Sequence, residues 1–152
     1  MKNTTDRFSF ILKPSTLNNG GVGVFVLHDI AEGAYMELFL PDFQEELHER
    51  NEIPKELQGY CLDQEGGKIL CPRFFNRMDI GNYVNHSENA NVRYEKGKGY
   101  FTTRSIQKGE EVLADYRQLG EPEDTWADYY KVVRKRCLTP FPPWQNRKTL
   151  LV

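Results

Sequence analysis

The sequence predicts a mostly β single domain with one or two helices, and three observations support this. Short runs of β-prone residues alternate with turns rich in Gly, Asn and Pro along most of the chain. Two of these turns, at 66–67 and 96–99, separate paired runs and predict β-hairpins. The strongest helical period lies in the segment 123–136. The order of the runs is that of a β-meander rather than of β-α-β units.

The β-prone runs give the expected strands, at 8–12, 24–28, 35–40, 60–62, 68–71, 92–95, 100–103 and 112–116. The first run ends at Lys13 and Pro14, because proline cannot continue a hydrogen-bonded ladder. The segment 41–50 is expected to form one short helix, since Pro41 suits a first turn. Phe43 and Leu47, four residues apart, would share one face of that helix.

The segment 123–136 reads as an amphipathic helix. Its apolar face consists of Trp126, Tyr129, Tyr130 and Val133. Acidic residues at its start and the basic residues 134–136 at its end both complement the helix dipole. The residues after it, 139–144, are rich in proline and are expected to be extended.

The composition is that of an ordinary soluble domain, with 39% apolar and 28% charged residues. The chain lacks the run of about 20 apolar residues that a spanning helix needs. Its N-terminus lacks the features of a secretory signal, so we expect a cytoplasmic or nuclear location. Cys61, Cys71 and Cys137 form no C-x-x-C pair, which indicates free thiols in a reducing compartment and no bound metal.

The net charge of −2 argues against a general nucleic-acid binder, but the charges are unevenly distributed. The segment 42–65 carries eight acids against two bases, and the segment 131–152 carries six bases and no acid. One interpretation is that both segments are ordinary solvent-exposed surface. Alternatively, the first is an acidic rim that attracts a basic partner by long-range steering.

The segment 81–91, GNYVNHSENAN, has an unusual composition for the middle of a chain. Four Asn, a His and a Ser surround Tyr83 and Val84. Such residues favour turns, because their short side chains bond the local backbone. Alone, the segment could be a surface turn or a binding site.

Three ordered motifs resemble those of the SET-domain protein-lysine methyltransferases. They are GVGVF at 21–25 with the turn at 29–33, NHSENAN at 85–91, and GEEVLADY at 109–116. The resemblance covers most of the chain. It implies small curved β-sheets with a knot-like core, in which the second and third motifs pack together, and a C-terminal helix. The chain would be one domain over 1–152, with a core at about 8–118 and a helix and extended tail at about 119–152.

The resemblance implies transfer of a methyl group from S-adenosylmethionine to a lysine of a basic protein, such as a histone-like tail, without a metal. Tyr116 would be catalytic, and Tyr60 a second channel tyrosine or a core residue. Positioning and electrostatics would supply most of the rate, and a phenol with a reference pKa of about 10 is a poor general base. A catalytically silent scaffold that binds peptides is the alternative. The implied cofactor-binding residues are Gly21, Val22, Gly23, Phe25, Asn85, His86 and Trp126.

The chain also departs from the family pattern. Ala90 stands where the family has proline and Glu88 where it has cysteine, and only Cys137 follows Tyr116 in place of a zinc-binding cluster. Trp126, Tyr129 and Tyr130 could close the substrate channel instead, although such an apolar stripe is also typical of core packing. Ala114 lies two residues before Tyr116, where a small residue would leave room for two or three methyl groups.

The resemblance also suggests partners. The acidic segment 42–65 would contribute to a groove for a basic protein or peptide. A homodimer that completes this groove is left open, whereas direct binding to nucleic acid or membrane is not expected.

Overall fold

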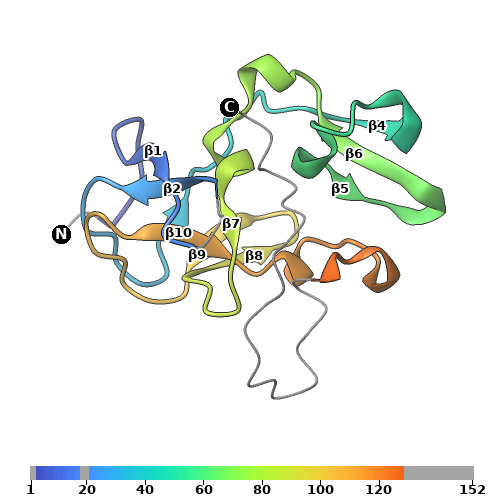
Figure 1. The fold of residues 1–152 in the computed structure, drawn as a ribbon. Coiled ribbons are helices and arrows are strands. Elements are labelled where there is room, and N and C mark those ends of the chain that lie inside the picture. The colour runs from blue at the N-terminus through green and yellow to red at the C-terminus, as the bar shows by residue number, and fades with distance from the viewer. Residues whose placement is uncertain (1–2, 18–20, 129–152) are drawn as a thin grey trace.

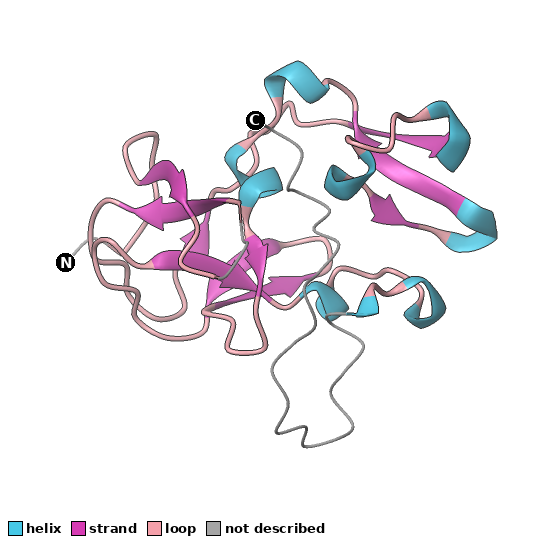
Figure 2. Ribbon diagram, viewed as in Figure 1, coloured by secondary structure: helices cyan, strands magenta, loops and turns pink. Residues whose placement is uncertain are grey.

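The computed structural model describes residues 3–17 and 21–128, which form two β-sheets joined by loops and short 3-10 turns (Figures 1 and 2). The strands of the larger sheet are β1 (Phe10–Pro14), β2 (Val22–Val26), β3 (Tyr35–Met36), β7 (Asn85–His86), β8 (Val92–Glu95), β9 (Gly99–Thr102) and β10 (Glu111–Ala114). The smaller sheet contains β4 (Glu45–Glu49), β5 (Leu62–Asp63) and β6 (Lys68–Pro72). The mostly β class predicted from the sequence is confirmed.

Seven 3-10 turns occur within the described residues. Five lie between strands: η1 (Arg50–Glu52), η2 (Gln58–Tyr60), η3 (Glu65–Gly67), η4 (Phe75–Arg77) and η5 (Ile80–Tyr83). The other two follow β10: η6 (Tyr116–Gln118) and η7 (Glu123–Thr125). In this part of the chain, no helix is long and apolar enough to cross a bilayer.

Strand β10 lies at the centre of the larger sheet, whose order is β1-β2-β10-β8-β9-β3. Its first half pairs antiparallel with β2, at Glu111 with Phe25 and Val112 with Val24. Its second half pairs in parallel with β7, at Leu113 with Asn85 and Ala114 with His86. The second and third sequence motifs therefore pack against each other, as the resemblance implied.

The core fills the space beside this central strand. Val24 of β2 and Val112 of β10 are fully buried, and so are Ile30 and Ile106, which form an isolated bridge. The other buried members are Val26, Ala34, Met36, Leu38, Val84, Val92 and Ala114. Burying these side chains removes apolar surface from water, and this is the main force that holds the strands in register.

Both predicted hairpins are present, but the predicted meander is wrong after β2. Strands β5 and β6 pair across Gly66 and Gly67, and β8 pairs with β9 across the turn at 96–98. Strand β3 pairs with β9 at the far end of the sheet and not with β2. Thr102 holds it there, because its backbone bonds Gly33 and Ala34 and its hydroxyl accepts from Ala34 N at 2.9 Å.

The predicted helix at 41–50 is wrong, because Glu45–Glu49 forms strand β4. Every residue of β4 pairs with β6, including Leu47 with Leu70. Leu47 is 54% exposed, and the ring of Phe43 packs against Phe39 with 4.5 Å between centroids. The four-residue spacing of Phe43 and Leu47 therefore did not mark a buried face, and the ladder with β6 outweighed local helix propensity.

The prediction of free thiols is wrong for Cys61 and Cys71, which form a disulfide in the smaller sheet. Their Cα atoms lie 4.3 Å apart, because the β5–β6 hairpin folds the ten-residue separation back on itself. Both cysteines are buried, and Ile69 completes their cluster. Cys137 lies outside the described residues.

A continuous helix that starts at Glu123 is also wrong. The chain makes the turn η7, and Trp126 then interrupts it with φ −57° and ψ 136°, outside the helical region. The rest of the predicted helix, beyond Asp128, lies outside the described residues.

Candidate functional site

Tyr116 is fixed at the point where β10 ends. It begins η6 instead of continuing the predicted strand, because the Asp115 side chain caps this turn and accepts from Arg117 N at 3.1 Å. The Tyr116 hydroxyl donates to Val84 O at 2.6 Å. Its ring lies 5.3 Å from the His86 ring, and its backbone N–H donates to His86 Nδ1 at 3.2 Å. The structure thus brings together Tyr116 and His86, 30 residues apart in sequence.

His86 is neutral at physiological pH. Its side chain is 8% exposed, and burial lowers its pKa to about 4, although the nearby Asp115 carboxylate acts in the opposite direction and Arg117 in the same direction. Nδ1 accepts the Tyr116 N–H, so the ring hydrogen of the neutral form is on Nε2. A second hydrogen on Nδ1 would put one donor against another.

The depressed pKa of His86 predicts an acid-sensitive fold. The folded-state pKa of about 4 lies below the ordinary value of 6.5, so the contribution of His86 to stability is present above pH 6.5 and is lost as the pH falls toward 4. At 1.36 kcal/mol per pKa unit, the loss is about 3 kcal/mol. Titration of the His86 ring by NMR, with the signal assigned from His86→Gln, should give a midpoint near 4. A midpoint above 6 would contradict this environment.

Asp115 and Arg117 form a partly buried ion pair beside His86. Arg117 donates to the two Asp115 carboxylate oxygens at 2.7 and 2.5 Å. Burial alone would raise the pKa of Asp115, but the hydrogen bonds from Arg117 outweigh it and hold that pKa below its ordinary value. The pair therefore remains charged and keeps the cap of η6 in place.

The glycine motif lies on β2, directly beside β10. Gly21 has a φ of 59°, in the left-handed region that glycine tolerates best. Gly23 faces Glu111, because a Cβ at Gly23 would lie only 2.1 Å from Glu111 Oε1. Val22 is 41% exposed, whereas Phe25 is buried and lies under the Lys13 ammonium.

Sequence reasoning missed Ser15 and Thr16, which bind Glu111 across the sheet. Ser15 Oγ donates to Glu111 Oε1 at 2.7 Å, and Thr16 donates to Oε2 through both its backbone N–H and its hydroxyl. Asn85 Nδ2 donates to Oε1 at 3.0 Å. The only signal in the sequence was the glutamate pair of the third motif, and that pattern does not indicate which glutamate is buried.

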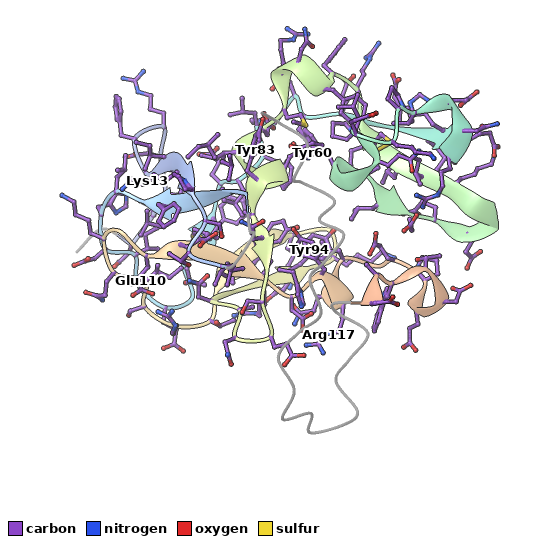
Figure 3. All side chains as sticks on the ribbon, viewed as in Figure 1. Lys13, Tyr60, Tyr83, Tyr94, Glu110 and Arg117 are labelled. Atoms are coloured by element: carbon purple, nitrogen blue, oxygen red, sulfur yellow. A yellow bond between two sulfur atoms is a disulfide. The ribbon has the colours of Figure 1, made fainter. Side chains whose placement is uncertain are left out.

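The two tyrosines Tyr60 and Tyr83 meet where the smaller sheet approaches the larger one (Figure 3). Their rings pack edge to face, with 6.0 Å between centroids. Burial raises the pKa of Tyr60, and the neighbouring Tyr83 raises it further. Tyr60 therefore remains a protonated phenol. Tyr83 directly precedes Val84, the acceptor for Tyr116.

Of the remaining predicted site residues, Ala114 pairs with His86 in the ladder of β7 and β10, whereas Trp126 lies elsewhere. Ala114 is 2% exposed and packs in the core of the larger sheet. Trp126 Nε1 donates to Glu121 O at 3.1 Å, and Glu121 Oε1 accepts from Asp63 N at 2.9 Å. This places Trp126 near the smaller sheet. Tyr129 and Tyr130 lie outside the described residues.

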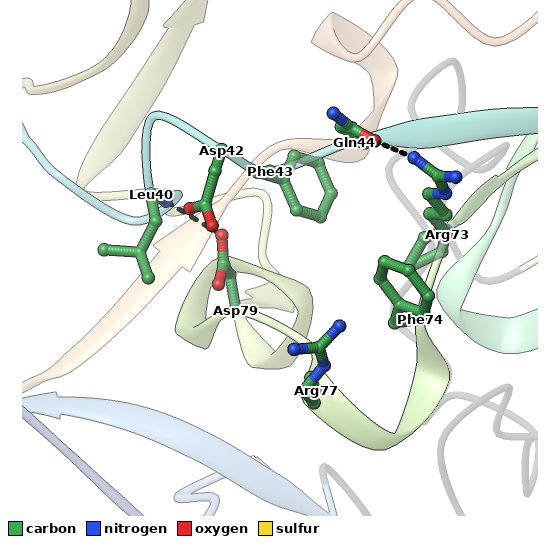
Figure 4. A pocket seen from close by; sticks show the side chains of 9 residues that line it. Leu40, Asp42, Phe43, Gln44, Arg73, Phe74, Arg77 and Asp79 are labelled. Atoms are coloured by element: carbon green, nitrogen blue, oxygen red, sulfur yellow. Dashed lines mark hydrogen bonds between the residues drawn. The ribbon is translucent and has the colours of Figure 1, made fainter.

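A separate pocket of about 240 Å³ opens between the start of β4 and η4 (Figure 4). None of the predicted site residues lines it. Its lining consists of Leu40, Asp42, Phe43, Gln44, Pro72, Arg73, Phe74, Arg77 and Asp79. The guanidinium groups of Arg77 and Arg73 lie 4.6 and 5.2 Å from the centre of the Phe74 ring. Within residues 3–17 and 21–128, no cluster of His, Cys, Asp or Glu is arranged to hold a metal ion.

Comparison with known proteins gives one family and a set of similar solved structures. The family model of the SET domain matches residues 21–117, more than half of the chain. One similar structure is a Plasmodium falciparum protein provisionally assigned as a histone methyltransferase, with a TM-score of 0.49 and 23% identity over 73% of this chain and 95% of that chain. Another is the methyltransferase domain of human PR domain-containing protein 2, with a TM-score of 0.47 and 22% identity over 70% of this chain and 76% of that chain. No curated protein matches.

Proposed function

The chain belongs to the SET-domain family, and on that premise we propose that it is a protein-lysine methyltransferase. It would use S-adenosylmethionine to methylate a lysine side chain of a basic protein, for instance a histone-like tail. The observation that carries the proposal is the arrangement around Tyr116. Its hydroxyl is held at Val84 O, and its backbone is held at His86, beside the parallel pair of β7 and β10.

The geometry of Tyr116 suits orientation of an amine and does not suit proton abstraction. The hydroxyl hydrogen is directed at Val84 O, so the oxygen can still accept a hydrogen bond. An incoming lysine amine would donate to this oxygen and be held in one orientation. Such positioning can supply a large share of the rate in a displacement reaction.

The residues of this site fit the implied cofactor, which supplies an activated methyl group on a sulfonium cation when bound. Asn82 Oδ1 is buried and has no hydrogen-bond partner among the described residues, so it offers an acceptor. The exposed Val22 and the left-handed Gly21 leave the backbone of the glycine motif accessible. The neutral His86 adds no positive charge that would repel a cation.

The substrate lysine must lose its proton before it can attack. The aromatic pair of Tyr60 and Tyr83 offers an apolar, partly buried approach. Desolvation disfavours the charged ammonium form there and lowers the pKa of the lysine. The proton would leave to water.

The acidic segment 42–65 favours a basic substrate. Strand β4 lies within this segment and carries exposed glutamates. Glu46 is paired with Arg73 at 3.0 Å, and Glu49 is 3.5 Å from Lys68. Burial raises the pKa of the Glu45 carboxyl, which weakens its charge. Glu46 and Glu49 are therefore the better probes of attraction at long range.

Reversing both charges, with Glu46→Lys and Glu49→Lys, is expected to raise KM for a basic peptide about three- to tenfold at low salt and to weaken its salt dependence. The physical reason is the loss of negative potential along β4. Steady-state kinetics at two ionic strengths would measure both effects. The matched control is Glu32→Lys with Glu37→Lys, the same charge change at exposed residues beside β3. An equal effect from both pairs would contradict a role for β4.

The proposal is tested by transfer of radiolabelled methyl groups from S-adenosylmethionine to a panel of core histones, other basic proteins and a whole-cell lysate. The expected result is label on lysine in a protein band. This label should be absent when the enzyme is left out. Calorimetric binding of S-adenosylhomocysteine without label on any protein would identify a silent scaffold instead. A protein that neither binds S-adenosylhomocysteine nor transfers label would contradict the proposal altogether.

A further inference from the structure

One buried carboxylate, that of Glu111, joins the segments that surround the glycine motif. Glu111 is 5% exposed. Its Oε1 accepts from Ser15 Oγ and Asn85 Nδ2, and its Oε2 accepts from the backbone and hydroxyl of Thr16. These donors are all neutral. Burial would raise the pKa of Glu111, but the hydrogen bonds outweigh it and hold the pKa below the ordinary value, so the group stays ionised.

Gly23 leaves the space that this carboxylate occupies. A Cβ at Gly23 would lie 2.1 Å from Glu111 Oε1 and 2.7 Å from its Cδ, and 3.3 Å from Asn85 Nδ2. Gly23 is not among the glycines with a positive φ. Glycine is therefore required here by the Glu111 side chain and not by the backbone conformation.

Glu111 also sets the orientation of the Asn85 carboxamide. Asn85 Nδ2 donates to Glu111 Oε1 and to Val22 O, each at 3.0 Å. An amide nitrogen carries two hydrogens, so both are used. Glu111 therefore holds the Asn85 side chain directly and is linked to the Val22 backbone through Asn85.

We infer that Glu111 is a positioning residue for the cofactor: from the interior, it fixes the Val22–Gly23 backbone and the Asn85 side chain on which the cofactor would rest. This inference rests on the proposed function. It also extends the cofactor site to Ser15 and Thr16, which do not belong to any of the three motifs. Preorganised groups of this kind bind a ligand more tightly because they lose less conformational freedom on binding.

The first test is Glu111→Gln, which keeps the shape but turns one acceptor oxygen into a donor that faces other donors. We expect the Kd for S-adenosylhomocysteine, measured by calorimetry, to rise at least tenfold, while KM for the peptide stays within twofold. The matched control is Glu110→Gln, because Glu110 is the adjacent glutamate and its carboxylate pairs with Arg104 at the surface. Its Kd should stay within twofold of wild type.

Calorimetry separates positioning from a purely structural role. A variant that is only less stable would bind with fewer sites per chain but an unchanged Kd. If Glu111→Gln fails to fold, Thr16→Val removes one hydroxyl donor and keeps the backbone donor, and it should raise the Kd at least threefold. An unchanged Kd in the folded fraction of these variants would overturn the inference.

A double-mutant cycle links Gly23 to Glu111 directly. Gly23→Ala should raise the Kd at least tenfold in the wild type, because the added methyl group displaces the carboxylate. In the Glu111→Ala background it should add less than twofold, since the space is then empty. Equal effects in both backgrounds would overturn the inference. A wild-type protein that binds no S-adenosylhomocysteine would contradict the proposed function itself, and the cofactor role of Glu111 with it.

Discussion

Tyr116→Phe is expected to lower kcat for methyl transfer by about 10²-fold or more, the usual scale for losing one preorganised polar group at a reacting centre. The substitution removes a single oxygen atom, which donates to Val84 O and would orient the lysine amine. The ring should stay near His86, because the backbone bond from Tyr116 N to His86 Nδ1 is unaffected. Single-turnover methyl transfer with saturating peptide would measure the loss.

Tyr35→Phe is the matched control for this variant. It removes the same atom from a tyrosine that is 47% exposed on β3, at the far end of the sheet. Its kcat should stay within about twofold of wild type. If Tyr116→Phe retained half of the wild-type kcat, Tyr116 would have no part in the chemistry.

Asn91→Ala is expected to destabilise the fold by about 3–5 kcal/mol, since each buried polar group left without its partner costs about 1–3 kcal/mol. Asn91 is 1% exposed. Its Nδ2 donates to Glu111 O at 2.7 Å, and its Oδ1 accepts from Leu113 N at 2.8 Å. One side chain therefore satisfies the backbone of β10 at two points. Urea unfolding followed by circular dichroism would measure the change.

Asn89→Ala is the matched control for Asn91, because Asn89 is exposed in the same loop. Asn89→Ala should change the free energy of unfolding by no more than about 0.5 kcal/mol. Asn91→Asp adds a second comparison. It keeps an acceptor for Leu113 N but places a carboxylate oxygen against Glu111 O, so it should also destabilise the fold. A cost below about 1 kcal/mol for Asn91→Ala would show that water replaces both bonds.

The sequence predicted the elements that depend on local chemistry. The glycine turns at Gly66 and Gly97 have the positive φ values that hairpins of this kind use, and both hairpins formed. The motif resemblance also anticipated that Asn85 and His86 would lie beside the strand leading to Tyr116. That expectation came from the family and not from any periodicity, because a parallel contact between distant segments leaves no local pattern.

The errors arose where a tertiary contact outweighed a local preference. The spacing of Phe43 and Leu47 suits a helix, but β4 gains a full ladder with β6. Cys61 and Cys71 carry no motif, and only the hairpin between them brings their Cα atoms to 4.3 Å. The network around Glu111 was equally hidden, since Ser15 and Thr16 are 95 to 96 residues away in sequence.

The central place of β10 has a consequence for how the chain reaches its native state. The strand with which β2, β7 and β8 all pair is the last of the ten described strands to be synthesised. Before β10 is synthesised, β2 can pair only with β1, and an isolated two-stranded hairpin is only marginally stable in water. Contacts so far apart in sequence form slowly, because the loops between them must close first. Nascent chains that end before residue 111 should therefore be substrates for chaperones and proteases rather than folding intermediates.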